Sequence, residues 1–127
     1  MLKPEMEASL QTARNLVLEY SQIVREQDME AILATLSHEI SLQIPDYPPL
    51  TGKEELKLFY EQRFNQAEYT FELNISDEKI VSDLYFINGI MHRTTIEASD
   101  RSTEALDFSF ILRHEDGNLK IWQMRLV

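Results

Sequence analysis

Three side chains in this sequence have the chemistry needed for proton transfer, namely Tyr20, Asp46 and His92. A tyrosine hydroxyl can donate a hydrogen bond to a developing oxyanion, and a carboxylate or an imidazole can accept a proton. Each also has a purely structural interpretation, as a core tyrosine, a solvated loop carboxylate and a half-exposed strand histidine. For His92, the catalytic alternative requires that it faces a cavity and pairs with Asp107 or Glu97. The three residues define an enzyme hypothesis that must be weighed against binding and assembly.

No metal or other cofactor is expected. The histidines His38, His92 and His114 lack the i, i+4 or H-x-H spacing that brings two imidazoles onto one metal ion. The chain has no cysteine, which excludes disulfides, thiolate catalysis and iron–sulfur clusters. Its three glycines do not form a glycine-rich phosphate-binding loop.

The charge balance excludes two classes of partner. The 127 residues contain 12 Lys and Arg against 22 Asp and Glu, a formal net charge of -10, and the basic residues are scattered. Phosphate backbones and anionic membrane surfaces repel such a protein, so we expect it to bind neither nucleic acid nor membrane. No apolar run approaches the roughly 18 residues of a membrane span, and residues 1–10 lack the apolar segment of a signal peptide. We therefore expect a cytoplasmic protein.

The elements that must position these side chains begin with helices. Between residues 5 and 27, apolar residues recur at steps of three and four, the period of one helix face; they are Met6, Leu10, Ala13, Val17, Tyr20 and Val24. Asp28 can cap a second, short helix, whose apolar face ends at Leu36. A third helix is predicted to follow Thr51-Gly52-Lys53-Glu54, which has the spacing of a capping box.

Strands are predicted where the apolar period changes to two. Residues 40–44 alternate before a proline-rich loop, and residues 69–75 alternate before a predicted turn at Ser76-Asp77-Glu78-Lys79. Residues 80–98 are too long for an unbroken strand, so Gly89 is expected to form a bulge that bends it. The last two strands are expected to pair through a hairpin at Asp116-Gly117. Helices followed by antiparallel strands, without a linker, predict a single α+β domain over residues 1–127.

Short matches along the chain, taken in order, carry a family resemblance. They are Asp28-Met29-Glu30-Ala31-Ile32, Leu50-Thr51-Gly52-Lys53-Glu54, Val81-Ser82-Asp83-Leu84-Tyr85 and Arg113-His114-Glu115-Asp116-Gly117-Asn118-Leu119-Lys120-Ile121. With the order of elements, they make the chain from Leu10 to Leu126 resemble the NTF2-like superfamily, in its SnoaL-like and ketosteroid-isomerase-like branch. The resemblance implies a cone-shaped α+β roll, in which three N-terminal helices pack on a strongly curved antiparallel sheet around a mostly apolar pocket. Such folds include isomerases, dehydratases, hydrolases, cyclases and non-catalytic binding or assembly modules, so the chemistry stays open.

The resemblance also implies positions for the groups of ketosteroid isomerase chemistry, which uses a carboxylate base with a tyrosine and a neutral carboxylic acid as oxyanion donors. The family's tyrosine falls on Tyr20. Its base falls on Ile44, and its second acid falls on Ser109 or Phe110, according to where a one-residue gap is placed. Two of the three groups are therefore missing, unless a displaced loop lets Asp46 act as the base.

One apolar face of the last two strands is the most informative feature for binding. Strict alternation places Phe108, Phe110, Leu112, Trp122, Met124 and Leu126 on this face, toward the helices. If the aromatic residues of the helices do not fill the space between, a dry pocket for a flat apolar ligand remains, and otherwise the space is a filled core. The predicted ligand-binding residues are Tyr20, Tyr60, Phe108, Phe110, Trp122 and Met124.

Three functions are left to distinguish. We favour a domain that binds a small apolar molecule without the usual isomerase acids. The first alternative is an isomerase, dehydratase or cyclase that uses Tyr20 with Asp46 or His92, and the second is a non-catalytic dimerisation module. A homodimer is expected, because alternation places Ile111 and Tyr85 on the outer face of the sheet.

Overall fold

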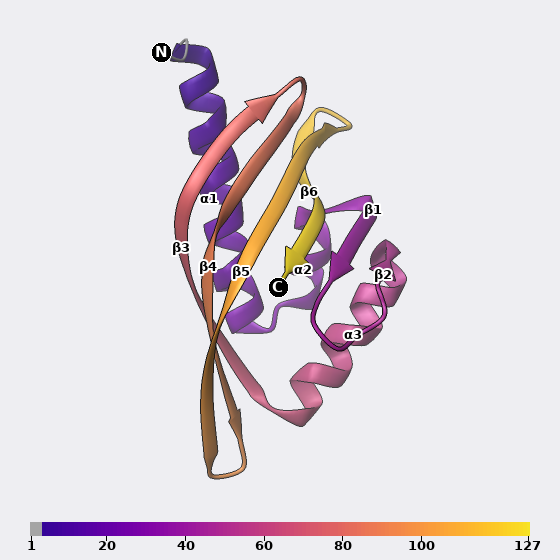
Figure 1. The fold of residues 1–127 in the computed structure, drawn as a ribbon. Helices are drawn as coiled ribbons and strands as arrows, with labels where there is room; N and C mark the ends of the chain where they lie inside the picture. The colour runs from indigo at the N-terminus through magenta and orange to yellow at the C-terminus, as the bar shows by residue number, and fades with distance from the viewer. Residues whose placement is uncertain (1–3) are drawn as a thin grey trace.

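Three helices pack against one six-stranded sheet in the computed structural model, which describes residues 4–127 (Figure 1). The helices are α1 (Pro4–Glu26), α2 (Met29–Thr35) and α3 (Gly52–Gln66). The strands are β1 (Leu36–Gln43), β2 (Leu50–Thr51), β3 (Glu68–Val81), β4 (Leu84–Glu97), β5 (Asp100–Glu115) and β6 (Asn118–Leu126). The α+β class and the three helices before the long strands are confirmed. The structure does not describe residues 1–3 or the side chain of Met6, so the expected burial of Met6 lies outside the described residues.

The sheet is curved and open, and its strands follow the order β2-β1-β6-β5-β4-β3. Helix α1 lies across β3 and β4, and α3 lies against β1 (Figure 1). Neighbouring strands are antiparallel except β1 and β6, which run parallel from Leu36 opposite Ile121 to Gln43 opposite Arg125. The predicted antiparallel sheet is therefore confirmed, with the exception of this one pairing. A short hairpin forces two strands to be antiparallel, but β1 and β6 are connected through α3 and three long strands. This long connection allows β6 to run parallel to β1.

The apolar stripe of α1 is buried against the sheet, as its period predicts. Its members are at most 7% exposed and comprise Leu10, Ala13, Val17, Tyr20 and Val24. Arg14 of the same helix pairs with Glu78 of β3, so a charged contact accompanies the apolar one. The helix therefore fixes the side chains at its C-terminal end, including Tyr20, over the inner face of the sheet.

Both later helices begin where the sequence predicts, but the capping box of α3 does not form, because the Thr51 side chain makes no capping hydrogen bond. The Asp28 carboxylate accepts a hydrogen bond from the Ala31 N–H at 3.2 Å and caps α2. At the start of α3, Glu55 accepts the hydrogen bond from the Thr51 N–H that the capping box assigns to Glu54. That assignment is wrong because Gly52 has a φ of +84°, which is not helical and moves the first helical turn one residue along.

Strand β3 continues through the segment that is predicted to be a turn. Residues 76–79 belong to β3, and Asp77, Glu78 and Lys79 remain paired with β4, so the turn prediction is wrong. They stay extended because Glu78 meets Arg14 of α1 and because the Lys79 ammonium lies 5.7 Å from the centre of the Phe86 ring. The reversal comes at residues 82–83, where Ser82 has a φ of 54°.

The bulge that is predicted at Gly89 lies on the facing strand instead. The register of β3 shifts between Ile75 and Asp77, so Ser76 is the extra residue. Gly89 is nevertheless required, because a Cβ there would lie 2.1 Å from the backbone oxygen of Asn74. The glycine lets the two strands approach closely at the bend.

A second register shift decides which face of β6 is buried. The shift between Ile111 and Leu112 leaves Trp122 as an extra residue on β6. Ile121 is therefore the inward residue, at 0% exposure, and the Trp122 ring lies 4.5 Å from the Arg113 guanidinium on the outer face. The predicted inward position of Trp122 is wrong because a bulge breaks strict alternation.

The hairpin at Asp116-Gly117 is confirmed, whereas the outward position of Tyr85 is wrong. Tyr85 is 8% exposed and pairs with Leu112 on the inner face, because the turn at residues 82–83 sets the phase of β4. Ile111 is half-buried and lies on the outer face, as predicted.

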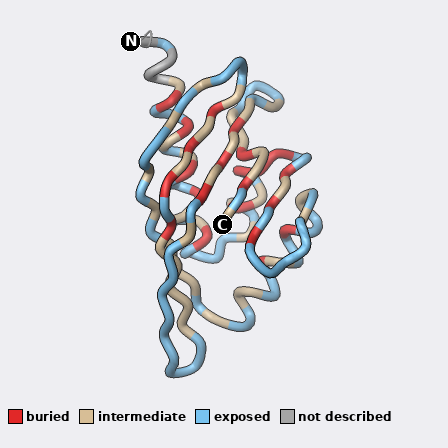
Figure 2. The backbone as a smooth tube through the Cα atoms, viewed as in Figure 1, coloured by how far each residue is buried: buried red, intermediate tan, exposed pale blue. Residues whose placement is uncertain are grey.

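Buried residues follow the inner face of the sheet under the helices (Figure 2). The far end of the β4–β5 hairpin extends beyond the helices, and its residues 97–105 are exposed (Figure 2). Within residues 4–127, no helix is long and apolar enough to cross a membrane.

Candidate functional site

A cavity of about 60 Å³ lies between α1, α3 and the inner face of the sheet. Its walls are mostly apolar and rich in aromatic rings. They comprise Tyr20, Ser21 and Val24 of α1, Phe59, Tyr60, Arg63 and Phe64 of α3, and Leu42, Ile44, Tyr69, Phe71, Leu73, Met91, Arg93, Phe110, Met124 and Leu126 of the strands and the loop after β1. One enclosed water needs roughly 10–15 Å³ of such space, so the cavity has room for about four to six waters, less than the cavity of about 150 Å³ that is known to enclose benzene.

The structure brings most of the predicted ligand-binding residues to this cavity. Tyr20, Tyr60, Phe110 and Met124 line it. Phe108 does not reach the lining, because its ring packs in the core with its centroid 5.3 Å from that of Phe110. Trp122 is excluded as well, because the bulge in β6 places it on the outer face.

Edge-to-face and stacked rings hold the two cavity tyrosines in place. The centroid of Tyr20 lies 5.9 Å from that of Phe110, and the centroid of Tyr60 lies 5.7 Å from that of Phe64. Burial raises the pKa of the Tyr60 phenol, and the nearby Arg63 charge opposes this only in part. Tyr60 therefore stays protonated at physiological pH and can donate a hydrogen bond but cannot serve as a base.

Of the three proton-transfer candidates, the structure brings only Tyr20 to the cavity. His92 lies on the outer face, where β4 pairs it with Glu72 and Ala105, and the cavity-facing alternative is wrong because alternation points its neighbour Met91 inward. Asp46 is exposed in the loop between β1 and β2 and does not reach the lining. The three residues do not form one site.

The positions where the family resemblance implies carboxylates are apolar in the cavity wall. Ile44 and Phe110 both line the cavity and carry no acidic group, whereas Ser109, the alternative position of the second acid, is not among the lining residues. Among the described residues that line the cavity, none is an aspartate, a glutamate or a histidine. The cavity therefore holds no side chain that accepts a proton at neutral pH.

Two arginines line this otherwise apolar cavity, and the sequence reasoning missed both. Arg93 pairs with Glu104 of β5, and its Nε is buried without a hydrogen-bond partner among the described residues. Burial lowers the pKa of Arg93, and the positive charge of Arg63 lowers it further. Arg93 lies two residues beyond Met91 in the inward phase of β4, a phase that the paired strands show.

Arg63 packs its guanidinium against aromatic rings. Its central carbon lies 5.3 Å from the ring centre of Tyr47, 4.8 Å from that of Phe59 and 5.7 Å from that of Tyr69. No carboxylate in residues 4–127 pairs with it. Arg63 therefore brings a positive charge to the cavity that no acidic side chain balances directly.

Comparison with known families decides where the chain belongs. A model of the SnoaL-like domain matches residues 13–126. The chain belongs to the SnoaL-like domain family. No protein of curated function matches this SnoaL-like domain in sequence.

Solved structures share the fold of this SnoaL-like domain at low sequence identity. A ketosteroid isomerase-like protein from Erwinia carotovora atroseptica is 20% identical, with a TM-score of 0.80, over 89% of this chain and 90% of that one. A proposed aromatic ring hydroxylase from Novosphingobium aromaticivorans is 14% identical, with a TM-score of 0.85, over 99% of this chain and 90% of that one. A proposed dehydratase of the NTF2-like family from Streptomyces avermitilis is 11% identical, with a TM-score of 0.80, over 94% and 95%. At these identities the likeness establishes the NTF2-like fold and leaves the chemistry open.

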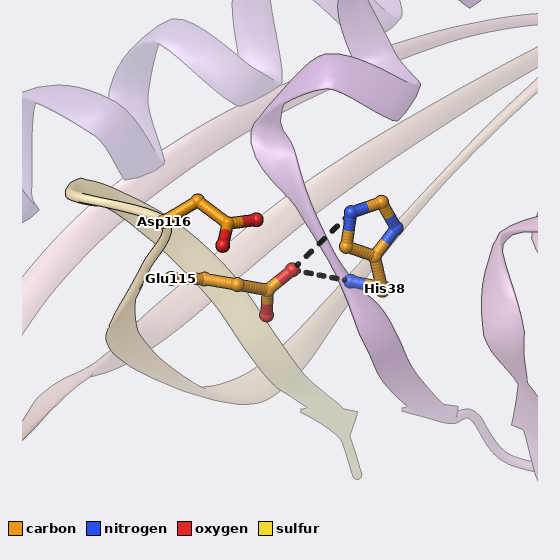
Figure 3. Close-up of side chains that lie close together, drawn as sticks. All are labelled: His38, Glu115 and Asp116. Atoms are coloured by element: carbon orange, nitrogen blue, oxygen red, sulfur yellow. Dashed lines mark hydrogen bonds and ion pairs between the residues drawn. The ribbon is translucent and has the colours of Figure 1, made fainter.

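A separate cluster in the SnoaL-like domain joins His38, Glu115 and Asp116 at the surface (Figure 3). One potential ligand atom from each residue lies within 4.8 Å of the others, the geometry of a possible cation site. The Glu115 carboxylate is already occupied, however, because it accepts hydrogen bonds from the Ser37 hydroxyl and from the His38 N–H, the latter at 2.9 Å. The first of these bonds is the main cause that lowers the pKa of Glu115. The cluster thus fastens β1, which includes His38, to the β5–β6 hairpin.

Proposed function

We propose that this SnoaL-like domain binds a small apolar molecule in the cavity between the helices and the sheet and does not catalyse isomerisation there. The observation that carries the proposal is the cavity wall, which is mostly apolar and aromatic, includes two arginines and, among its described residues, contains neither a carboxylate nor an imidazole. Preformed apolar cavities with few polar groups are the usual binding sites for small ligands.

The absence of a base from the lining is the argument against the enzyme alternative. A general base typically contributes a factor of about 10² to 10⁴ to the rate, and Ile44 can supply none of it. Tyr20 could donate a hydrogen bond to an oxyanion, but a donor without a base leaves the proton-transfer step uncatalysed. The names of the solved relatives cover several chemistries and therefore favour no single reaction for this domain.

Xenon and toluene are suitable first probes, because both enter small dry cavities. We expect both to bind the parent protein, as measured by the chemical shift of dissolved ¹²⁹Xe and by ligand-observed NMR of toluene. The variant Leu73→Trp fills the cavity from β3 and should abolish binding. The matched variant Ile90→Trp adds the same ring on the outer face, where Ile90 is 42% exposed, and should bind like the parent. If neither probe binds the parent, or if Leu73→Trp binds both probes unchanged, the proposal is wrong.

A further inference from the structure

The charges around the cavity carry information about the ligand beyond its apolar body. The whole chain has a formal net charge of -10, yet the charged residues among the described lining are the cations Arg63 and Arg93. Burying a cation in an apolar wall costs free energy unless an anion or hydrogen-bond acceptor compensates it. Two cations at one small cavity therefore need an explanation.

Arg93 is only partly compensated by the protein. One of its terminal amino groups bonds to Glu104, which is half exposed on the neighbouring strand. Its Nε is buried and lacks a partner among residues 4–127. A buried donor without an acceptor is uncommon in folded proteins, and a bound group with an acceptor oxygen is one way to satisfy it.

Arg63 adds a second positive charge, which the charge of Arg93 repels. Its guanidinium stacks on aromatic rings, and its charge lowers the pKa of Arg93, which means that the two cations interact unfavourably. An anion bound by both guanidinium groups would attract each of them and offset this repulsion. A carboxylate fits this role because each guanidinium can donate to its two oxygens in a planar arrangement.

We infer that the ligand of this cavity is a small carboxylate with an apolar body of about one ring. Its carboxylate accepts hydrogen bonds from Arg93 Nε and from Arg63, and its body packs against Tyr20, Phe71 and Phe110. The cavity volume of about 60 Å³ makes one ring the upper limit for this body. This inference rests on the proposed function, since it names the ligand class of the same cavity.

A matched pair of ligands separates the carboxylate from the apolar body. Cyclohexanecarboxylate and cyclohexanecarboxamide have nearly the same shape and differ in charge. By isothermal titration calorimetry at neutral pH, we expect the carboxylate to bind the parent protein at least about tenfold more tightly, the factor expected for a charge-assisted hydrogen bond. The negative net charge of the protein opposes this preference, so a preference of this sign must come from local cations.

Variants then assign the preference to the two arginines. Arg93→Gln and Arg63→Gln should each remove most of the preference and leave carboxamide affinity nearly unchanged. Arg101→Gln removes the same charge from the exposed end of the β4–β5 hairpin and should keep the full preference. Arg93→Lys keeps the charge without the Nε donor and should show an intermediate preference, which also covers the case in which Arg93→Gln fails to fold.

The outcomes distinguish the two proposals. If the carboxamide binds as tightly as the carboxylate, or if both glutamine variants keep the preference, the carboxylate inference is wrong and the apolar binding site stands. If xenon, toluene and both cyclohexane compounds all fail to bind, the binding site itself is wrong and the inference fails with it.

Discussion

The bulge in β6 predicts that a smaller residue matters more for stability than its larger neighbour. Ile121 is 0% exposed, so Ile121→Ala leaves a cavity and should cost about 2–5 kcal/mol. Trp122→Ala removes a larger side chain but one that lies half-buried on the outer face. It loses the contact with Arg113, worth about 0.5–1 kcal/mol, and part of its apolar burial, so we expect a total of about 1–2 kcal/mol.

Urea unfolding followed by far-ultraviolet circular dichroism measures both costs. Fluorescence is unsuitable for the comparison because Trp122 is the single tryptophan of the chain. With a slope of about 2 kcal/mol per molar urea, a difference of about 1 kcal/mol separates the two midpoints by roughly 0.5 M. In a filled core without the bulge, Trp→Ala would cost about 3–5 kcal/mol. A loss for Trp122→Ala that exceeds the loss for Ile121→Ala would therefore place Trp122 inside and refute the bulge.

The remaining predictions concern other parts of the molecule. Gly89→Ala should destabilise the protein by at least about 1–3 kcal/mol, because its Cβ meets backbone atoms that cannot move aside, and an unchanged thermal midpoint would contradict the close approach of β3. A β,γ-unsaturated ketone should not be isomerised, and rapid turnover that is lost in Asp46→Asn but kept in Asp107→Asn would make Asp46 the base. Since hydrogen bonds lower the pKa of Glu115 in the folded state, its stabilisation is present above the unfolded pKa and is lost as the pH falls through the lower, folded pKa. Glu115→Gln should therefore lower the free energy of unfolding at neutral pH and make that free energy decline less below about pH 4. Parallel plots of unfolding free energy against pH for the two proteins would count against this. The predicted homodimer should use the outer sheet face, so Ile90→Lys should shift the sedimenting species toward the 14.9 kDa monomer. A parent protein that is monomeric at high concentration would contradict the prediction.

Local signals in the sequence predicted the elements where short-range chemistry decides them. The Asp28 cap, the stripe of α1 and the Asp116-Gly117 hairpin each depend on residues within a few positions of one another. The turn at residues 76–79 failed for the opposite reason. The polar side chain of Glu78 belongs in a strand only because Arg14, far away in the sequence, lies beside it.

The candidate site was predictable in its apolar part and not in its charged part. Alternation and helix period brought Tyr20, Tyr60, Phe110 and Met124 together, because these patterns encode which face is buried. The position of Trp122 depends on a bulge, which adds a residue without a clear sequence mark. Arg93 was overlooked because an arginine is expected to face solvent, and only the paired strands show that it faces inward.

The parallel pairing of β1 with β6 has a consequence for how the chain acquires its structure during synthesis. On the ribosome, α1, α2 and β1 emerge early, but β1 gains its long neighbour only after β6 has left the exit tunnel. Until then β1 lacks this hydrogen-bonded neighbour, a state that favours chaperone contact or aggregation. Pairing so distant in sequence also slows folding of the released chain, since a large loop must close before the contact forms. A nascent chain stalled before β6 should accordingly be protease-sensitive in β1, and this sensitivity should disappear once β6 emerges.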